Sequence, residues 1–111
     1  MTFKQGDIVA LDFSPTQGHE QTGYRPSLVI SRDFYNEKTG YIIVCPITTT
    51  LKPFPLRISL DSRTKTTGDI ICEQMRTIDV AARNPKFLEK IPEDLLRQVM
   101  EIISSIFENR I

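Results

Sequence analysis

The sequence predicts a mainly β protein with a C-terminal helix, in which a small, strongly bent sheet or barrel carries one helix packed on it. Short β-prone stretches follow one another through the first three quarters of the chain, and polar segments rich in turn-forming residues separate them. The last stretch instead spaces its apolar residues as one face of a helix. Six or so short strands followed by one amphipathic helix fit this architecture.

The β-prone stretches are short, and most of them alternate between apolar and polar residues or are apolar throughout. The predicted strands cover residues 7–13, 26–31, 41–48, 56–60 and 69–80. The stretch 41–48 has the highest β-propensity, but Pro46 lacks a backbone N–H, so we expect a bulge or an edge position there. The stretch 69–80 predicts either one long strand or two strands with a bend.

The segments between these strands are predicted as loops and turns. Residues 14–23 contain two glycines and no apolar residue except Pro15, which predicts a loop. Residues 32–40 hold turn formers and at most one helical turn, and 61–68 is a polar turn.

A helix is predicted over residues 92–108. Pro92 followed by two acidic residues is typical of a helix start. Apolar residues then recur at helical spacing, which marks the buried face. They are Leu95, Val99, Ile102, Ile103 and Ile106, with Leu96, Met100 and Phe107 widening the stripe. The stripe is wide enough that one part can cover the sheet and another can face a second copy of the chain.

Composition is that of one compact globular domain spanning residues 1–111. The chain shows no apolar run long enough for a transmembrane helix and no signal-peptide pattern, and its two cysteines, Cys45 and Cys72, lie in apolar stretches as buried thiols would. We therefore expect a cytoplasmic protein without a membrane partner.

The charge balance by itself does not suggest a nucleic-acid binder, because 14 basic and 14 acidic residues cancel. The distribution is uneven, with a mildly basic middle between residues 52 and 90 and an acidic C-terminal part. This asymmetry is compatible with a local positive patch on a neutral protein.

Several enzyme classes are excluded by missing motifs. The sequence has no P-loop, no GxGxxG pattern and no Cys/His cluster with metal spacing, and His19 is its only histidine. A mechanism that needs two histidines of one chain is therefore impossible, and no cofactor or metal is expected.

Two polar features stand at strand ends. Arg25 directly precedes Pro26, which restrains its backbone, and its guanidinium can bind a phosphate through two parallel hydrogen bonds; the alternative is an ordinary surface arginine in a hairpin. Thr48, Thr49 and Thr50 follow the stretch that Pro46 interrupts, and their hydroxyls can bind a phosphate or a water; the alternative is turn chemistry with high β-propensity.

These features form part of a longer pattern. It consists of Gly6-Asp7-Ile8-Val9, the segment 12–21, Arg25-Pro26, Val29-Ile30-Ser31, Pro46-Ile47-Thr48-Thr49 and the segment 73–79. In this order and at these spacings, from about residue 4 to residue 107, the chain resembles the MazF/PemK toxins.

The resemblance implies a small SH3-like barrel of the PemK/CcdB type that forms a homodimer. It also implies a toxin that cleaves single-stranded RNA at specific sequences, leaves 2′,3′-cyclic phosphate and 5′-hydroxyl ends, and is neutralised by an antitoxin protein. Arg25 and Thr48 fall on the family's catalytic pair. The residues that match RNA-contacting positions are Thr16, Gln17, His19, Glu20, Gln21, Thr49, Gln74 and Arg76.

The implied reaction is chemically consistent with these residue types. A cyclic phosphate forms when the substrate's own 2′-oxygen attacks, so the protein must orient the phosphate, stabilise extra negative charge and move two protons. Arg25 suits charge stabilisation but not proton abstraction, because an arginine pKa exceeds about 12. Glu20 and His19 are the candidates for accepting the 2′-proton, or they are solvated loop residues.

Two alternatives use the same fold with another function. One is a CcdB-like protein that poisons DNA gyrase by binding; the tryptophan-containing C-terminal ending of such proteins is absent here. The other is an SH3-like interaction module, for which the sequence shows no aromatic groove.

Overall fold

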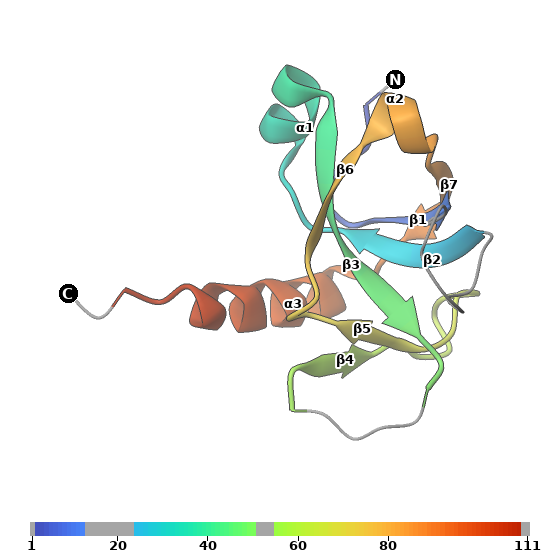
Figure 1. Ribbon diagram of the computed structural model, residues 1–111. Coiled ribbons are helices and arrows are strands. Elements are labelled where there is room, and N and C mark those ends of the chain that lie inside the picture. Colours follow the sequence, from blue (N-terminus) through green and yellow to red (C-terminus); the bar gives the residue numbers. More distant parts are fainter. Residues whose placement is uncertain (1, 13–23, 51–54, 110–111) are drawn as a thin grey trace, which may run out of the picture.

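The computed structural model describes residues 2–12, 24–50 and 55–109. The strands are β1 (Asp7–Asp12), β2 (Tyr24–Val29), β3 (Tyr41–Thr48), β4 (Arg57–Ser59), β5 (Asp69–Ile71), β6 (Arg76–Asp79) and β7 (Lys86–Lys90). The helices are α1 (Asp33–Thr39), α2 (Val80–Arg83) and α3 (Glu93–Ile106) (Figure 1). The prediction of a mainly β protein with a C-terminal helix is confirmed.

The strands form one antiparallel sheet in the order β4-β5-β3-β2-β1-β7, and β6 pairs with β3 beside this path. The order ends at β4 and β7, and these two strands do not pair with each other in the described part of the chain. The sheet is therefore barrel-like but open rather than closed.

Strand β3 lies inside the sheet and is not an edge strand; the bulge or edge position expected at Pro46 corresponds to a break in pairing on one side of the strand only. Its register against β2 runs from Val44 to Pro46 without interruption. The N–H of Ile43 donates to Ser31 and its carbonyl accepts from Ile30, so odd-numbered residues of β3 bond towards β2. Pro46 therefore turns its missing donor to the other edge, where pairing with β6 ends at Val44 and pairing with β5 begins at Ile47.

The bent sheet buries an apolar cluster on each of its two faces. The larger cluster contains Ile8, Leu28, Cys45, Ile47 and Ile70 together with the buried side chains of α3. The smaller one consists of Val9, Leu11, Val29, Ile42, Val44 and Ile78. Because successive strand residues point to opposite faces, β2 and β3 contribute to both clusters in alternation.

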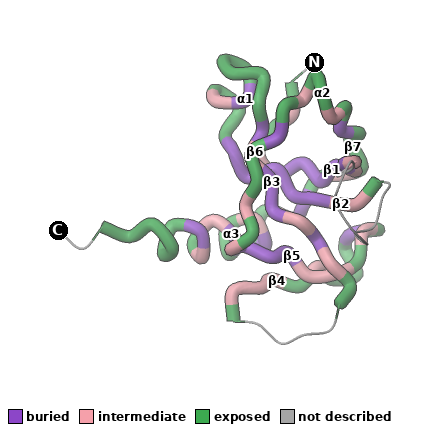
Figure 2. The backbone as a smooth tube through the Cα atoms, viewed as in Figure 1, coloured by how far each residue is buried: buried purple, intermediate pink, exposed green. Residues whose placement is uncertain are grey.

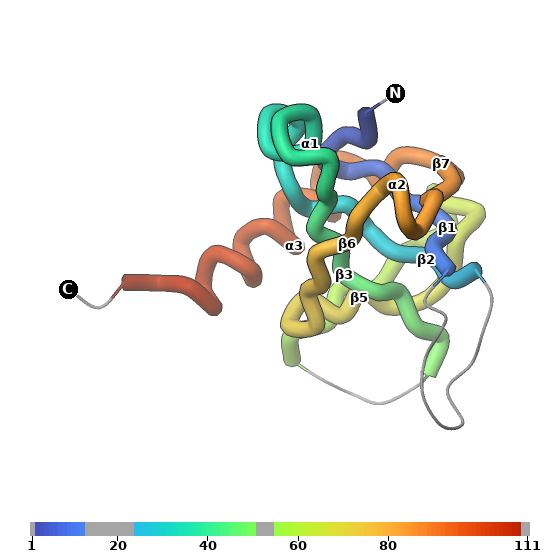
Figure 3. The backbone as a smooth tube through the Cα atoms, turned by 45° about the horizontal axis from the view of Figure 1, so that its top comes forward, coloured from blue at the N-terminus to red at the C-terminus, as the bar shows by residue number. Residues whose placement is uncertain are grey.

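Helix α3 covers the larger cluster with the first part of its apolar stripe. Leu95, Val99 and Ile103 are buried against the sheet. Towards its end the helix projects away from the sheet, as both views show, and its exposure rises (Figures 1, 2 and 3). Ile106 and Phe107 are 40% and 69% exposed, so the predicted helix is confirmed but part of its apolar stripe is uncovered in the single chain.

Several local predictions need correction. Strand β2 begins at Tyr24 rather than at Pro26, so Arg25 lies within the strand rather than before it. The stretch 69–80 is two strands, β5 and β6, separated by a turn. The segment 32–40 holds a seven-residue helix, α1, whose Asn36 is buried and donates to the carbonyls of Phe3 and Ser31.

The sequence analysis did not predict α2 and β7. Three of the five residues of β7 are charged, which hides its strand character. Pairing with β1 specifies the strand instead, together with the ion pair between Lys90 Nζ and Asp7 Oδ1 at 2.7 Å.

The two cysteines are buried free thiols, as predicted. Burial raises the pKa of Cys45 to about 12 and that of Cys72 to about 11, with smaller contributions from the neighbouring Glu73 carboxylate. Among the described residues, no helix has the length and apolar character needed to cross a membrane.

Candidate active site

Where the smaller apolar cluster ends, the same face of the sheet becomes polar. Alternation places Arg25 and Ser27 on the face of Val29, Thr48 on the face of Val44, and Arg76 on the face of Ile78. Cross-strand pairing adds residues of β5 and β4, because Asp69 lies opposite Thr48 and Ser59 opposite Asp69. We call this set the polar face: Arg25, Ser27, Thr48, Arg57, Ser59, Asp69 and Arg76.

Arg25 and Thr48 stand at the ends of the two central strands. The ladder between β2 and β3 reaches Ser27 and Pro46, and Arg25 and Thr48 each lie two residues beyond that pair. The two strand ends diverge there (Figure 1). Both side chains are half-buried, and between them Ser27 is fully buried with no partner for its hydroxyl oxygen among the described residues. The fold thus brings Arg25 and Thr48 to one region of one face.

The hydroxyl oxygen of Thr48 accepts one hydrogen bond. The backbone N–H of Thr50 donates to Thr48 Oγ1 at 3.1 Å, so the hydroxyl proton remains available to donate elsewhere. A shallow cavity of about 210 Å³ lies here, lined by Thr48, Thr49, Thr50, Gly68 and Asp69. A hydroxyl donor beside a small polar cavity suits the binding of a phosphate oxygen or of a sugar hydroxyl.

Gly68 is required by the close packing of two backbones at this cavity. Its φ is 126°, and a Cβ atom at this position would lie 2.5 Å from the carbonyl oxygen of Thr48. No side chain fits there unless the backbone around Thr48 moves. The position of Thr48 therefore depends on a glycine directly before β5, the strand that pairs with the end of β3.

The other predicted contact residues lie on both sides of this region. Arg76 is exposed at the start of β6, opposite Val44. Gln74 is exposed in the turn before it, where its N–H donates to the carbonyl of Ile71. Thr49 is exposed directly after Thr48. The predicted residues of the loop, Thr16, Gln17, His19, Glu20 and Gln21, lie outside the described residues.

Comparison with known proteins identifies the family. The family model of the PemK-like, MazF-like toxins of type II toxin–antitoxin systems matches residues 4–107. The chain is 36% identical over 107 residues to the endoribonuclease PemK of Escherichia coli, covering 93% of this chain and 80% of that protein. It is 38% identical over 78 residues to the endoribonuclease toxin MazF of Escherichia coli (strain K12), covering 70% of this chain and 69% of that one.

A solved structure agrees with these relatives. The crystal structure of a MazE–MazF complex from Deinococcus radiodurans is similar with a TM-score of 0.87 and 33% identity, covering 96% of both chains. The chain belongs to the PemK-like, MazF-like toxin family. The resemblance noted in the sequence is thereby confirmed, and the matched residues agree with its predicted extent.

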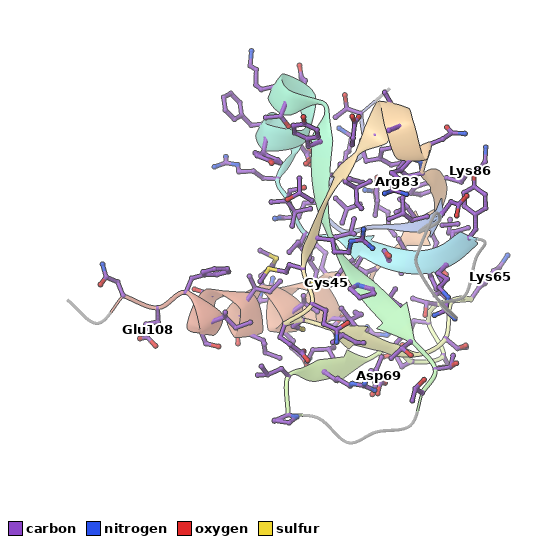
Figure 4. All side chains as sticks on the ribbon, in the orientation of Figure 1. Cys45, Lys65, Asp69, Arg83, Lys86 and Glu108 are labelled. Carbon is purple, nitrogen blue, oxygen red and sulfur yellow. The ribbon has the colours of Figure 1, made fainter. Side chains whose placement is uncertain are left out.

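The structure adds residues to the site of this MazF-like chain that the sequence analysis did not single out. Arg57, Ser59 and Asp69 share the polar face with Thr48, and Asp69 lies on β5 near the end of β3 (Figure 4). The alternation of Arg57 and Ser59 with apolar neighbours in β4 was a signal that they face away from the larger cluster. Nothing in the sequence showed that Arg57, Ser59 and Asp69 lie on the same face of the sheet as Thr48.

Glu73 is a further acidic group that the sequence analysis did not treat separately. It follows β5 and is half-buried, and its Oε1 atom is buried without a hydrogen-bond partner among the described residues. In the same part of the chain, no three His, Cys, Asp or Glu side chains come together as a metal site would require.

Replacing Gly68 tests the close packing at Thr48. We expect Gly68→Ala to lower the free energy of unfolding clearly more than Gly40→Ala does. Both glycines have positive φ, 126° and 74°, but a Cβ at Gly40 meets nothing within 4 Å. Backbone strain alone costs about 1–2 kcal/mol for an L-residue in the left-handed region. Urea unfolding of both variants measures the difference, and equal losses would contradict the close approach to Thr48.

Proposed function

We propose that this chain is the toxin of a type II toxin–antitoxin system, a cytoplasmic, metal-independent endoribonuclease formed by one domain over residues 1–111. It cleaves single-stranded RNA, mRNA included, at specific sequences and leaves 2′,3′-cyclic phosphate and 5′-hydroxyl ends, which inhibits translation and growth. The observation that carries the proposal is the placement of Arg25 and Thr48 on one face at the diverging ends of β2 and β3.

In this proposal Arg25 is the electrostatic clamp on the scissile phosphate. Its guanidinium stabilises the negative charge that develops as the 2′-oxygen attacks, and it is the candidate donor to the leaving 5′-oxygen. Thr48 holds the phosphate or the 2′-hydroxyl by a hydrogen bond, and its hydroxyl proton is free to donate because its observed bond, from the N–H of Thr50, uses Oγ1 as the acceptor. Glu20 and His19 remain the candidates for accepting the 2′-proton.

The RNA strand is proposed to run across the polar face. Arg25 and Arg76 supply positive charge there on a chain whose net charge is zero. Gln74 and Thr49 are exposed beside them and can read base edges, as the loop residues Thr16, Gln17, His19, Glu20 and Gln21 are proposed to do. The Watson–Crick edges of the bases are accessible only in unpaired RNA, so this readout requires a single-stranded substrate.

The family match favours a ribonuclease over the gyrase-poison alternative. The relatives reported above are named endoribonucleases. A gyrase poison acts by binding alone and does not need an arginine and a hydroxyl on one face at the ends of two neighbouring strands.

Single substitutions test the proposed chemistry. Arg25→Ala and Thr48→Ala are each expected to reduce the cleavage rate of a long single-stranded transcript by about 10²–10³-fold, the scale for losing one transition-state donor. Thr48→Ser keeps the hydroxyl and should retain more activity than Thr48→Ala.

Cleavage should persist in EDTA, and a 2′-deoxy substitution at the cleaved linkage should abolish it while leaving binding largely intact.

Arg83→Ala is the matched control for Arg25→Ala, because Arg83 is also half-buried but lies in α2 at the far end of β6 from the polar face. It should cut RNA at the rate of the unaltered protein. If Arg25→Ala folds normally and cleaves as fast as this control, the assignment of the site is wrong.

We also propose that the functional unit is a homodimer joined partly through α3. The end of this helix projects from the sheet and carries Ile106 and the 69% exposed Phe107 (Figure 3). Apolar residues on a projecting helix end are costly in water and typical of an interface. An interface of this kind is expected to bury about 1,200–2,000 Å² or more in total.

Phe107→Glu is expected to shift the protein from dimer to monomer in sedimentation velocity. Phe34→Glu is the matched control, because Phe34 is 64% exposed but lies on α1, and it should leave the dimer intact. A protein that sediments as a monomer at micromolar concentration before any substitution would refute the dimer.

An antitoxin is proposed to inhibit by occupying the RNA-binding surface. The solved structure of a MazE–MazF complex shows that a similar chain assembles with an antitoxin. An acidic, disordered segment that folds as it binds would be attracted to Arg25 and Arg76. In a titration, the cognate antitoxin should displace a 2′-deoxy, uncleavable RNA. Simultaneous, independent binding of both would rule out this form of inhibition.

A further inference from the structure

The segment that carries Thr48 has little support from the sheet. Pairing of β3 with β2 ends at Pro46, so Thr48 pairs only with Asp69 of β5, and the chain then leaves the sheet. A catalytic hydroxyl at the end of a strand that pairs on one side only needs another restraint on its position. A displacement of about 1 Å is enough to reduce a reaction rate strongly.

Arg57 supplies such a restraint from β4. Its Nη1 atom donates to the carbonyl oxygen of Thr50 at 2.8 Å and lies 3.9 Å from Asp69 Oδ2. The Arg57 side chain is only 13% exposed, so packing limits its rotamers. The other oxygen of the same carboxylate, Asp69 Oδ1, accepts from Ser59 Oγ at 2.7 Å. The Arg57 guanidinium thus lies near Asp69, the residue opposite Thr48, and is hydrogen-bonded to the backbone of Thr50, two residues after Thr48.

The restraint reaches the hydroxyl of Thr48 through Thr50. The carbonyl of Thr50 is held by Arg57, and the N–H of Thr50 donates to Thr48 Oγ1 at 3.1 Å. Holding Thr50 therefore holds the donor that sets the rotamer of Thr48. The accepted bond also restricts the directions in which the Thr48 hydroxyl proton can donate.

We propose that Arg57 is a positioning residue for the ribonuclease reaction, acting through Thr50 to orient the Thr48 hydroxyl, with the carboxylate of Asp69 near its guanidinium. The inference rests on the proposed function, because it assigns a role towards Thr48 as a catalytic group. It predicts that Arg57 affects the chemical step and not the binding of RNA.

The test compares three measurements on Arg57→Gln. They are single-turnover cleavage of a short single-stranded RNA with one cleaved linkage, binding of the same RNA with a 2′-deoxy group at that linkage, and urea unfolding. We expect cleavage to fall about 10- to 100-fold, while RNA affinity changes little. Arg57→Lys, which can still donate to Thr50, should recover part of the rate.

Arg63→Gln is the matched control. Arg63 also pairs with aspartates, Asp61 and Asp94, but lies away from the polar face, so this variant should cleave normally.

The coupling with Thr48 decides the assignment. In a Thr48→Ala background, Arg57→Gln should cause no further loss of the residual cleavage, because its effect passes through the missing hydroxyl. An equal loss in both backgrounds, or a loss of affinity as large as the loss of rate, would overturn the inference in favour of direct contact with RNA. Normal cleavage by Arg57→Gln would overturn it as well. Failure of the proposed function is recognised separately, because Thr48→Ala alone would then cleave normally.

Discussion

The exchange of partners along β3 is the constraint on which the rest of the structure depends. One edge of this strand pairs with β2, and the other pairs first with β6 and then with β5. Pro46 stands where this second edge changes its partner from β6 to β5, so its missing N–H leaves no carbonyl of a paired strand without a donor. A proline elsewhere on that edge would remove a hydrogen bond from β6 or β5. The bend of the sheet and the position of Thr48 two residues later both follow from this arrangement.

The same arrangement places the residues of the apolar clusters and the proposed catalytic residues in different parts of each strand. Buried aliphatic residues occupy the second half of β2 and most of β3 on both faces, where the two strands pair. Polar groups occupy the start of β2 and the end of β3, where pairing between the two strands has stopped and water or a ligand can reach the backbone. Arg25 and Thr48 therefore lie on a rigid scaffold at a point where they do not have to be buried. Gly68 and Arg57 restore the order that the end of β3 would otherwise lack.

The apolar pattern predicted those elements whose own residues specify them. Helix α3 was found because its stripe repeats at helical spacing, and 41–48 coincided with β3 because its residues strongly favour a strand. Strand β7 and helix α2 were not found. Three charged residues interrupt β7, and pairing with β1 supplies the hydrogen bonds that its composition does not suggest. The predicted start of β2 is two residues late because Tyr24 and Arg25 directly follow a polar loop, whereas Asp12 and Leu11 of β1 pair with them.

For the site, the resemblance carried by the ordered motifs predicts Arg25 and Thr48 as the catalytic pair, and the family match over residues 4–107 includes both positions. The sequence could not show which residues surround them. Thr48 is 21 residues from Asp69 and 9 from Arg57, and only the register of β3, β5 and β4 brings the three onto one face. A residue's type and local spacing are properties of the chain, and they determined the family and the catalytic candidates. The contacts that orient a hydroxyl come from pairing between distant strands, which is a property of the folded molecule.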